Sequence, residues 1–242
     1  VYLTFGTPAE AKTALEEAMK NTSYGLESTT KKVFDVGNKM NREIIFALYY
    51  NKTNDNGHGY WYSTNTDVMA DIRNPTPEFK AIYDETDNRL ALISTYTKIQ
   101  SNLFAMTKWY DTYDATYNTQ VGNDFPHLRY ADITLMYAEA LAETDLPTAL
   151  TWLNKTRTRA GLDELTSDDI KTKAEFIREL AAERGREFAL EGHRWFDLVR
   201  LGLAVEHFRN LGYTLDAHNL IFPIPQNQIE IVNNPSILWQ NP

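Results

Sequence analysis

The sequence contains no cysteine among its 242 residues. This absence excludes disulfide frameworks, zinc sites built from thiolates and cysteine nucleophiles. It leaves the cellular compartment open, because a cysteine-free chain works equally well in oxidising and reducing surroundings. Long hydrophobic runs are absent too: the longest, Ile44 to Tyr50, has seven residues, whereas a membrane-spanning helix needs roughly 18. That run predicts a buried strand instead.

The chain also lacks an excess of basic residues. Lys and Arg number 24 against 33 Asp and Glu, which gives a formal net charge of −9. This charge argues against general nucleic-acid binding, which needs a basic face opposite the phosphates. Phosphate-binding glycine loops, Gly-x-Ser-x-Gly and Ser-x-x-Lys motifs are missing as well, so the sequence gives little support for an enzyme. The hydrophobic share of 43% is ordinary for a globular protein and excludes global disorder.

Helical patterns dominate both ends of the chain. Thr7, Pro8 and Glu10 have the residue types of a capping box at a helix start. A segment from 128 to 143 and another from Pro147 to a glycine stop at 161 carry apolar residues at helical spacing. Their short connection predicts an antiparallel hairpin of the tetratricopeptide type. Further helices are expected from Ser167-Asp168 onwards and over residues 194–201.

The middle of the chain has weaker periodicity and many turn-forming residues. Here we expect strands and one short helix separated by loops, at residues 43–50 and 90–98 for the strands and 77–83 for the helix. The chain therefore divides into the end of a helical hairpin (1–24), a loop-rich region with short strands (25–125) and a helical region (126–242). The loop-rich region is where a binding surface is expected, because function concentrates in loops.

The densest charged constellation spans residues 183–200. Glu187 and Glu191 lie four residues apart on one helix face, which is one possible arrangement for the paired carboxylates of a glycoside hydrolase. Arginines within helical reach would lower the pKa values of these carboxyls and make them poor general acids. A buried structural ion network is therefore the favoured interpretation. The expected arginine partners are Arg184, Arg186, Arg194 and Arg200.

Two weaker patterns contain residue types that can bind metal ions. His193 and Asp197 have helical i, i+4 spacing, but no third ligand is near them in the sequence. Residues 84–89 are acidic, yet they lack the glycine and the terminal glutamate of a calcium loop, and Arg89 is a ready partner for Asp87. We therefore predict neither a metal, a cofactor nor catalytic residues.

Two aromatic clusters interrupt the loop-rich region and are the candidate ligand-binding residues. Flat rings beside Asp, Asn and hydroxyl groups suit sugars, whose C–H faces stack on rings while their hydroxyls form hydrogen bonds. The alternative is that these rings pack beneath long loops as a satellite core. The candidate residues are His58, Tyr60, Trp61 and Tyr62 in the first cluster, and Trp109, Tyr110 and Tyr113 in the second.

Four ordered sequence blocks resemble the SusD/RagB family of outer-membrane nutrient-binding lipoproteins. Residues 1–127 match the family only loosely. The four blocks are LRYADITLMYAEAL at 128–141, LNKTRTRAGL at 153–162, REFALEGHRWFDL at 186–198, and LIFPIPQ at 220–226 with Ile229 and the terminal Asn241-Pro242.

The resemblance implies a mainly α, SusD-like fold with tetratricopeptide-like hairpins, long loops and a few short strands. It implies a non-catalytic protein on the surface of the outer membrane, which captures oligosaccharides and passes them to a SusC-like TonB-dependent transporter. The motif blocks would be scaffold, and ligand contacts vary across the family, so none is carried over to this sequence. The family's lipidated cysteine, signal peptide and first helical repeats have no counterpart here. We therefore expect a piece of a longer protein, attached to the membrane only through an anchor outside this sequence.

Two alternative functions stay open on the sequence. The first is a helical-repeat scaffold that binds only its transporter. The second is a glycoside hydrolase that uses the carboxylates of the 183–200 constellation.

Overall fold

A computed structural model describes residues 1–51, 63–65, 76–94, 96–100, 103–106, 108 and 122–240. The chain forms two compact units, Val1–His193 and Arg194–Pro242, and each is described by itself. Among the described residues, no helix is long and apolar enough to cross a membrane.

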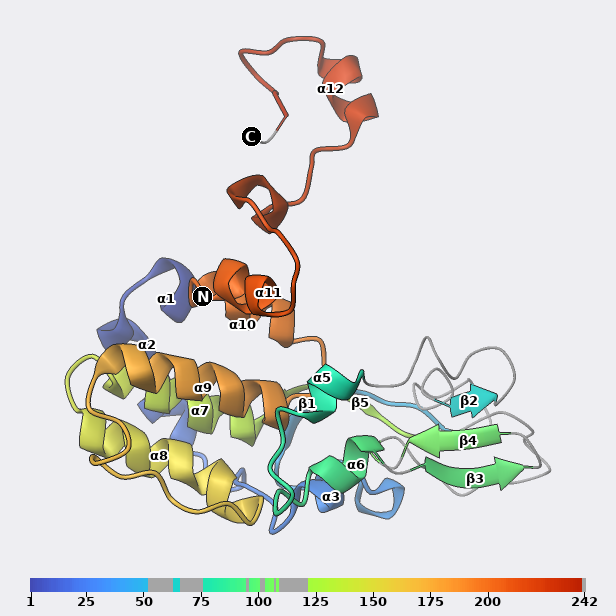
Figure 1. Ribbon diagram of the computed structural model, residues 1–242, viewed down its shortest axis with the longest axis vertical. Coiled ribbons are helices and arrows are strands. Elements are labelled where there is room, and N and C mark those ends of the chain that lie inside the picture. Colours follow the sequence, from blue (N-terminus) through green and yellow to red (C-terminus); the bar gives the residue numbers. More distant parts are fainter. Residues whose placement is uncertain are drawn as a thin grey trace. The chain divides into compact units, whose positions relative to one another are not determined.

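Four helices form the body of the first unit (Figure 1). They are α2 (Pro8–Met19), α7 (Tyr130–Leu141), α8 (Leu146–Arg159) and α9 (Lys173–Glu187). Helix α7 packs against α2, α8 and α9, and α8 also packs against α9. The predicted hairpin between residues 128 and 161 is confirmed as α7 and α8, and the expectation of a mainly helical fold is confirmed as well.

Local capping chemistry decides where these helices begin and end. The capping box predicted at Thr7 is confirmed, with its hydroxyl accepting from the Glu10 amide at 3.3 Å. Gly161 follows the α8 cap with φ +84°, a conformation that favours glycine. The helix start predicted at Ser167-Asp168 is wrong, because α9 begins only after a capping box at Thr172. Residues 166–170 instead form a turn of their own, held by side-chain hydrogen bonds between Thr166 and Asp169.

The core of the first unit lies where these helices meet. Small residues at the α7–α8 contact are fully enclosed and let the two backbones approach closely; they are Ala131, Ala138 and Ala149. Larger side chains complete the cluster, among them Leu135, Leu153, Phe176 and Leu180. The Tyr137 ring meets Trp152 edge to face at 4.7 Å, and its hydroxyl donates to Glu16 Oε1 at 2.8 Å, which ties α2 to α7.

One short helix precedes α2, and other short elements follow each other between α2 and α7. The helical ones are α1 (Tyr2–Phe5), α3 (Thr30–Val33), the 3-10 turn η1 (Val36–Asn38), α5 (Pro77–Lys80) and α6 (Leu90–Ser94). The strands are β1 (Ile44–Leu48), β2 (Ser63–Asn65), β3 (Tyr96–Gln100), β4 (Leu103–Met106) and β5 (Phe125–Arg129). Strand β1 pairs antiparallel with β5, and the other three form an antiparallel sheet in the order β2-β4-β3.

The two predictions for strands fare differently. The strand expected at 43–50 is confirmed as β1. The expectation that it is buried is wrong, because Ile44 is enclosed whereas Phe46 and Leu48 are exposed. The strand expected over 90–98 is wrong in its first half, where the chain forms α6, and β3 begins at Tyr96. The turn at Asp87, whose carbonyl accepts from the Leu90 amide at 3.0 Å, leads the chain into this helix.

The second unit consists of short helices. They are α10 (Arg194–Arg200), α11 (Ala204–Asn210), the 3-10 turn η4 (Ala217–Leu220) and α12 (Gln226–Val232). Leu198 and Ala204 are buried, and the Phe208 ring meets Trp195 at 5.8 Å and Tyr213 at 6.3 Å. The helix predicted over 194–201 is confirmed as α10.

Candidate functional site

The predicted ligand-binding residues lie outside the described part of the chain. This holds for both aromatic clusters, so their role stays a prediction, as does the alternative that they pack beneath loops. The residues concerned are His58, Tyr60, Trp61, Tyr62, Trp109, Tyr110 and Tyr113.

The described strands show where both clusters join the fold. The first cluster ends immediately before β2, and the second begins three residues after the end of β4. These strands pair antiparallel with Ser63 opposite Ala105 and Asn65 opposite Leu103, so the start of β2 lies beside the end of β4. Both clusters are therefore connected to the same end of one sheet, although about 45 residues separate them in the sequence. Sequence periodicity could not reveal this, because strand register depends on long-range pairing.

Residues 50 and 124, which flank the wider segment that contains both clusters, lie side by side. Asp124 Oδ1 accepts from the Tyr50 amide at 2.9 Å and from the Lys39 ammonium at 2.8 Å. The Lys39 ammonium also donates to the Tyr50 carbonyl at 2.5 Å and lies 4.4 Å above the Tyr49 ring centroid. This junction holds together the end of β1 and the start of β5. Sequence patterns contain no signal for the Lys39–Asp124 pair, because 85 positions separate the two residues.

The first unit contains a buried network of charges, and Arg129 is at its centre. Its guanidinium donates to Glu43 Oε1 at 2.8 Å, to Glu187 Oε1 at 2.6 Å and to Glu191 Oε2 at 2.7 Å. Arg129 is 2% exposed, so these pairs are shielded from water. The residue ends β5 and directly precedes α7, which places the network where sheet and helices meet.

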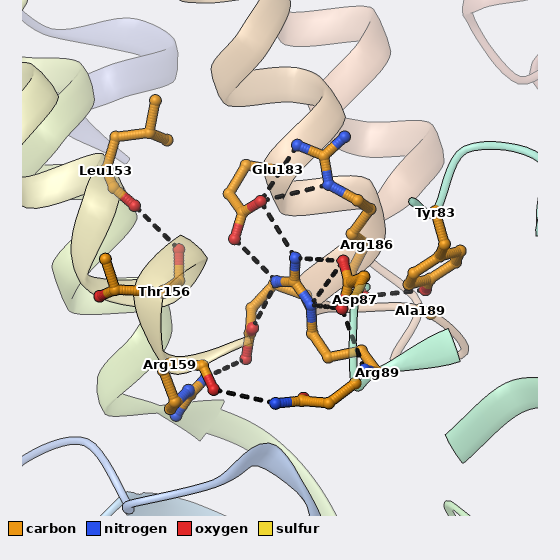
Figure 2. Close-up of polar contacts among 12 residues, drawn as sticks. Tyr83, Asp87, Arg89, Leu153, Thr156, Arg159, Glu183, Arg186 and Ala189 are labelled. Carbon is orange, nitrogen blue, oxygen red and sulfur yellow. Dashed lines mark hydrogen bonds and ion pairs between the residues drawn. The ribbon is translucent and has the colours of Figure 1, made fainter. Parts of the chain in front are cut away.

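A second arginine extends the network towards α6. Figure 2 shows the Arg89 guanidinium between Asp87 and Glu183, with Arg186 reaching the same Glu183 carboxylate. Arg89 also donates to Glu187 Oε2 at 2.9 Å. The sequence expectation that Arg89 pairs with Asp87 is confirmed, and calcium ligation by Asp87 is thereby disfavoured.

The expected arginine partners of Glu187 and Glu191 are wrong, although the expected ion network is present. Glu187 pairs with Arg89, Arg129 and Arg159, and Glu191 pairs with Arg129 and Lys108. These cations come from distant parts of the chain, whereas helical reach selects only sequence neighbours. Of the expected arginines, Arg184 pairs with Asp132, Arg186 with Glu179 and Glu183, and Arg200 with Asp197.

The electrostatics of this network suit a scaffold better than an acid catalyst. Burial raises the pKa of the Glu187 carboxyl, but the guanidinium groups of Arg159, Arg129 and Arg89 outweigh it and hold that pKa well below its usual value. The pKa of Glu191 is likewise lowered, because Arg129 and Lys108 outweigh the effect of burial. A general acid needs a raised pKa to keep its proton near neutral pH. Both carboxylates are instead ionised and enclosed.

The fold adds no third metal ligand to the pair His193 and Asp197 or to the acidic residues 84–89 within the described part of the chain. Within the described ranges, no group of three or more His, Cys, Asp or Glu side chains is placed to hold a metal ion. The His193 ring packs against Phe188 at 4.7 Å, and Asp197 pairs with Arg200 at 2.8 Å.

Lys108 links the network to the sheet that carries the aromatic clusters. Its ammonium donates to the Ala189 carbonyl at 2.5 Å and to Glu191 Oε1 at 2.7 Å. It also lies 4.4 Å above the Phe34 ring centroid. Sequence reasoning missed this residue, because a single lysine between aromatic residues is indistinguishable from a solvated one.

The sequence of this chain is similar to those of the SusD family. The profile of the SusD family matches residues 83–242. SusD-like protein P2 of Formosa agariphila is 24% identical over 290 residues, an alignment that covers all of this chain and 57% of that protein. The chain thus spans somewhat more than half of that relative's length.

Solved structures share the fold. Surface glycan-binding protein A from Bacteroides thetaiotaomicron superposes with a TM-score of 0.72 at 19% identity, covering 99% of this chain and 61% of that one. The same protein in complex with laminarihexaose also matches, with a TM-score of 0.71. A laminarin binding SusD-like protein matches with a TM-score of 0.68 at 23% identity, covering 100% of this chain and 60% of that one. The resemblance seen in the four sequence blocks is therefore confirmed, and the chain belongs to the SusD family.

Proposed function

We propose that this chain is part of a cell-surface binding protein that captures oligosaccharides and passes them to a SusC-like TonB-dependent transporter of the outer membrane. The proposal rests on one observation, the family match over residues 83–242. Relatives of the same fold are described as glycan-binding and laminarin binding, and one of them is in complex with laminarihexaose. The proposed function involves no catalysis.

The proposed ligand surface consists of the two aromatic clusters. Its residues are His58, Tyr60, Trp61, Tyr62, Trp109, Tyr110 and Tyr113. The pairing of Ser63 with Ala105 supports a shared surface, because it connects both clusters to one end of the β2-β4-β3 sheet. Stacking on several rings, with hydroxyl groups bonded to neighbouring polar side chains, is the chemistry that sugars require.

Calorimetry with a panel of oligosaccharides that includes laminarihexaose tests the binding role. We expect Trp61→Ala and Trp109→Ala each to weaken the affinity of the best ligand about tenfold, since a ring contributes about 1 kcal/mol or more to stacking. Trp239→Ala is the matched control, because this exposed tryptophan lies in the second unit. Unchanged affinity in both cluster variants would show that the ligand binds elsewhere.

Two further measurements separate this function from its alternatives. Co-purification with a β-barrel transporter, together with failure to bind any glycan, would favour the scaffold that serves only its transporter. Release of reducing sugar that Glu187→Gln abolishes, under conditions where circular dichroism shows the variant to be folded, would favour a glycoside hydrolase. We expect no turnover, because Glu187 is enclosed by three arginines and ionised.

A further inference from the structure

Lys108 is a lysine in a place where lysines are rarely found. Its side chain is 2% exposed, and it follows β4 by only two residues. A buried ammonium is tolerated only when its charge and its donors are satisfied. Here the Glu191 carboxylate, the Ala189 carbonyl and the Phe34 ring supply the partners.

The acceptors that receive Lys108 are themselves held in place. The Glu191 carboxylate accepts hydrogen bonds from Arg129 Nε at 2.7 Å and Nη2 at 2.9 Å. It is therefore oriented independently of Lys108. The turn that follows α9 carries both acceptors. Its backbone enters the left-handed region at Leu190 (φ 64°) and Gly192 (φ 86°). The helical body therefore presents a preformed anion and carbonyl to the lysine.

We propose that Lys108 is a positioning residue, whose buried ammonium fixes the end of β4 to the helical body and so sets the affinity of the oligosaccharide surface. This inference rests on the proposed function. The end of β4 lies beside the start of β2, so one anchor restrains the sheet end to which both aromatic clusters are connected. Burial lowers the pKa of Lys108, and the neighbouring Glu191 carboxylate partly offsets this effect.

The variant Lys108→Met tests the anchor. Methionine keeps most of the side-chain volume and removes the charge and the donors, while Glu191 keeps both bonds from Arg129. Arg157→Met is the matched control: it removes a cation from the α8–α9 ion pair, and its partner Glu179 likewise keeps a second arginine, Arg186. The two substitutions therefore remove comparable charges and differ in whether the sheet is tethered.

Amide hydrogen exchange and calorimetry are the two readouts. We expect Lys108→Met to accelerate exchange of the β4 amides (103–106) about tenfold or more, because charge-assisted hydrogen bonds that resist local opening are lost. We expect it also to weaken binding of the best oligosaccharide from the laminarihexaose panel about tenfold. Arg157→Met should lower the unfolding temperature without changing either readout.

Each outcome decides a separate part of the proposal. Unchanged β4 exchange in Lys108→Met would overturn the anchor. Faster exchange with unchanged affinity would overturn its role in ligand binding. If the unmodified chain binds no oligosaccharide, the proposed function fails and the affinity role of Lys108 fails with it, while the exchange comparison still decides the anchor.

Discussion

Replacing Glu187 by glutamine should destabilise this protein far more than a change of a single oxygen to nitrogen suggests. The carboxylate is 1% exposed and accepts from Arg129 at 2.6 Å, Arg159 at 2.5 Å and Arg89 at 2.9 Å. Glutamine removes the negative charge and turns an amide donor towards one of these guanidinium groups, which are donors only. The network is then short of one anion, while every arginine stays buried.

The structure sets the expected size of this effect. Removing one partner of a buried ion pair costs about 3–5 kcal/mol, because the opposite charge is left uncompensated. A domain of this size loses about 2–4 °C of unfolding temperature per kcal/mol, so we expect a decrease of about 6–20 °C. The same substitution at Glu143, which pairs with Lys173 at the surface, should cost at most about 1 kcal/mol.

Urea unfolding of the full chain, followed by circular dichroism, measures the difference. Glu143→Gln is the matched control, since it makes the same chemical change in an exposed pair. If Glu187→Gln lost no more free energy of unfolding than Glu143→Gln, the view of the network as a coupled structural unit would be refuted. A loss of several kcal/mol would support it.

Four further predictions concern stability and use the same urea assay. Leu153→Ala should cost about 2–5 kcal/mol, because Leu153 is fully enclosed between helices; a loss below 1 kcal/mol would contradict this packing. Thr172→Ala should cost about 1 kcal/mol by removing the capping box of α9, whereas Thr172→Ser should be nearly neutral. Gly161→Ala should cost about 1–2 kcal/mol, because alanine is strained at φ +84°. Since the folded-state pKa of Glu187 is lowered, its contribution to stability is present above its unfolded pKa of about 4.3 and is lost as the pH falls through the folded value. The acid dependence of unfolding should therefore be shallower in Glu187→Gln than in the unmodified chain.

Features that local chemistry controls could be predicted from the amino-acid residues alone. These features are the capping box at Thr7, the glycine stop at 161 and the helical hairpin between residues 128 and 161. Each follows from residues within a few positions of each other. The buried ion network was also predictable in kind, because a dense run of charges in a packed helix requires partners. Local patterns did not distinguish between two possible helix starts: Thr172 caps α9, and the earlier Ser167-Asp168 pair does not.

The identity of the groups that meet in the folded protein depends on tertiary packing. The partners of Glu187 come from residues 89, 129 and 159, and helical spacing within 183–200 cannot select them. The Lys108 ammonium donates to Glu191, which is 83 residues away in the sequence. Ser63 lies opposite Ala105 because of the register between β2 and β4. Such contacts depend on how separate elements pack, and burial then makes their charges strong and mutually dependent. The absence of cysteine excludes disulfides, thiolate zinc sites and cysteine nucleophiles. The positions of the charged side chains relative to one another depend on the fold.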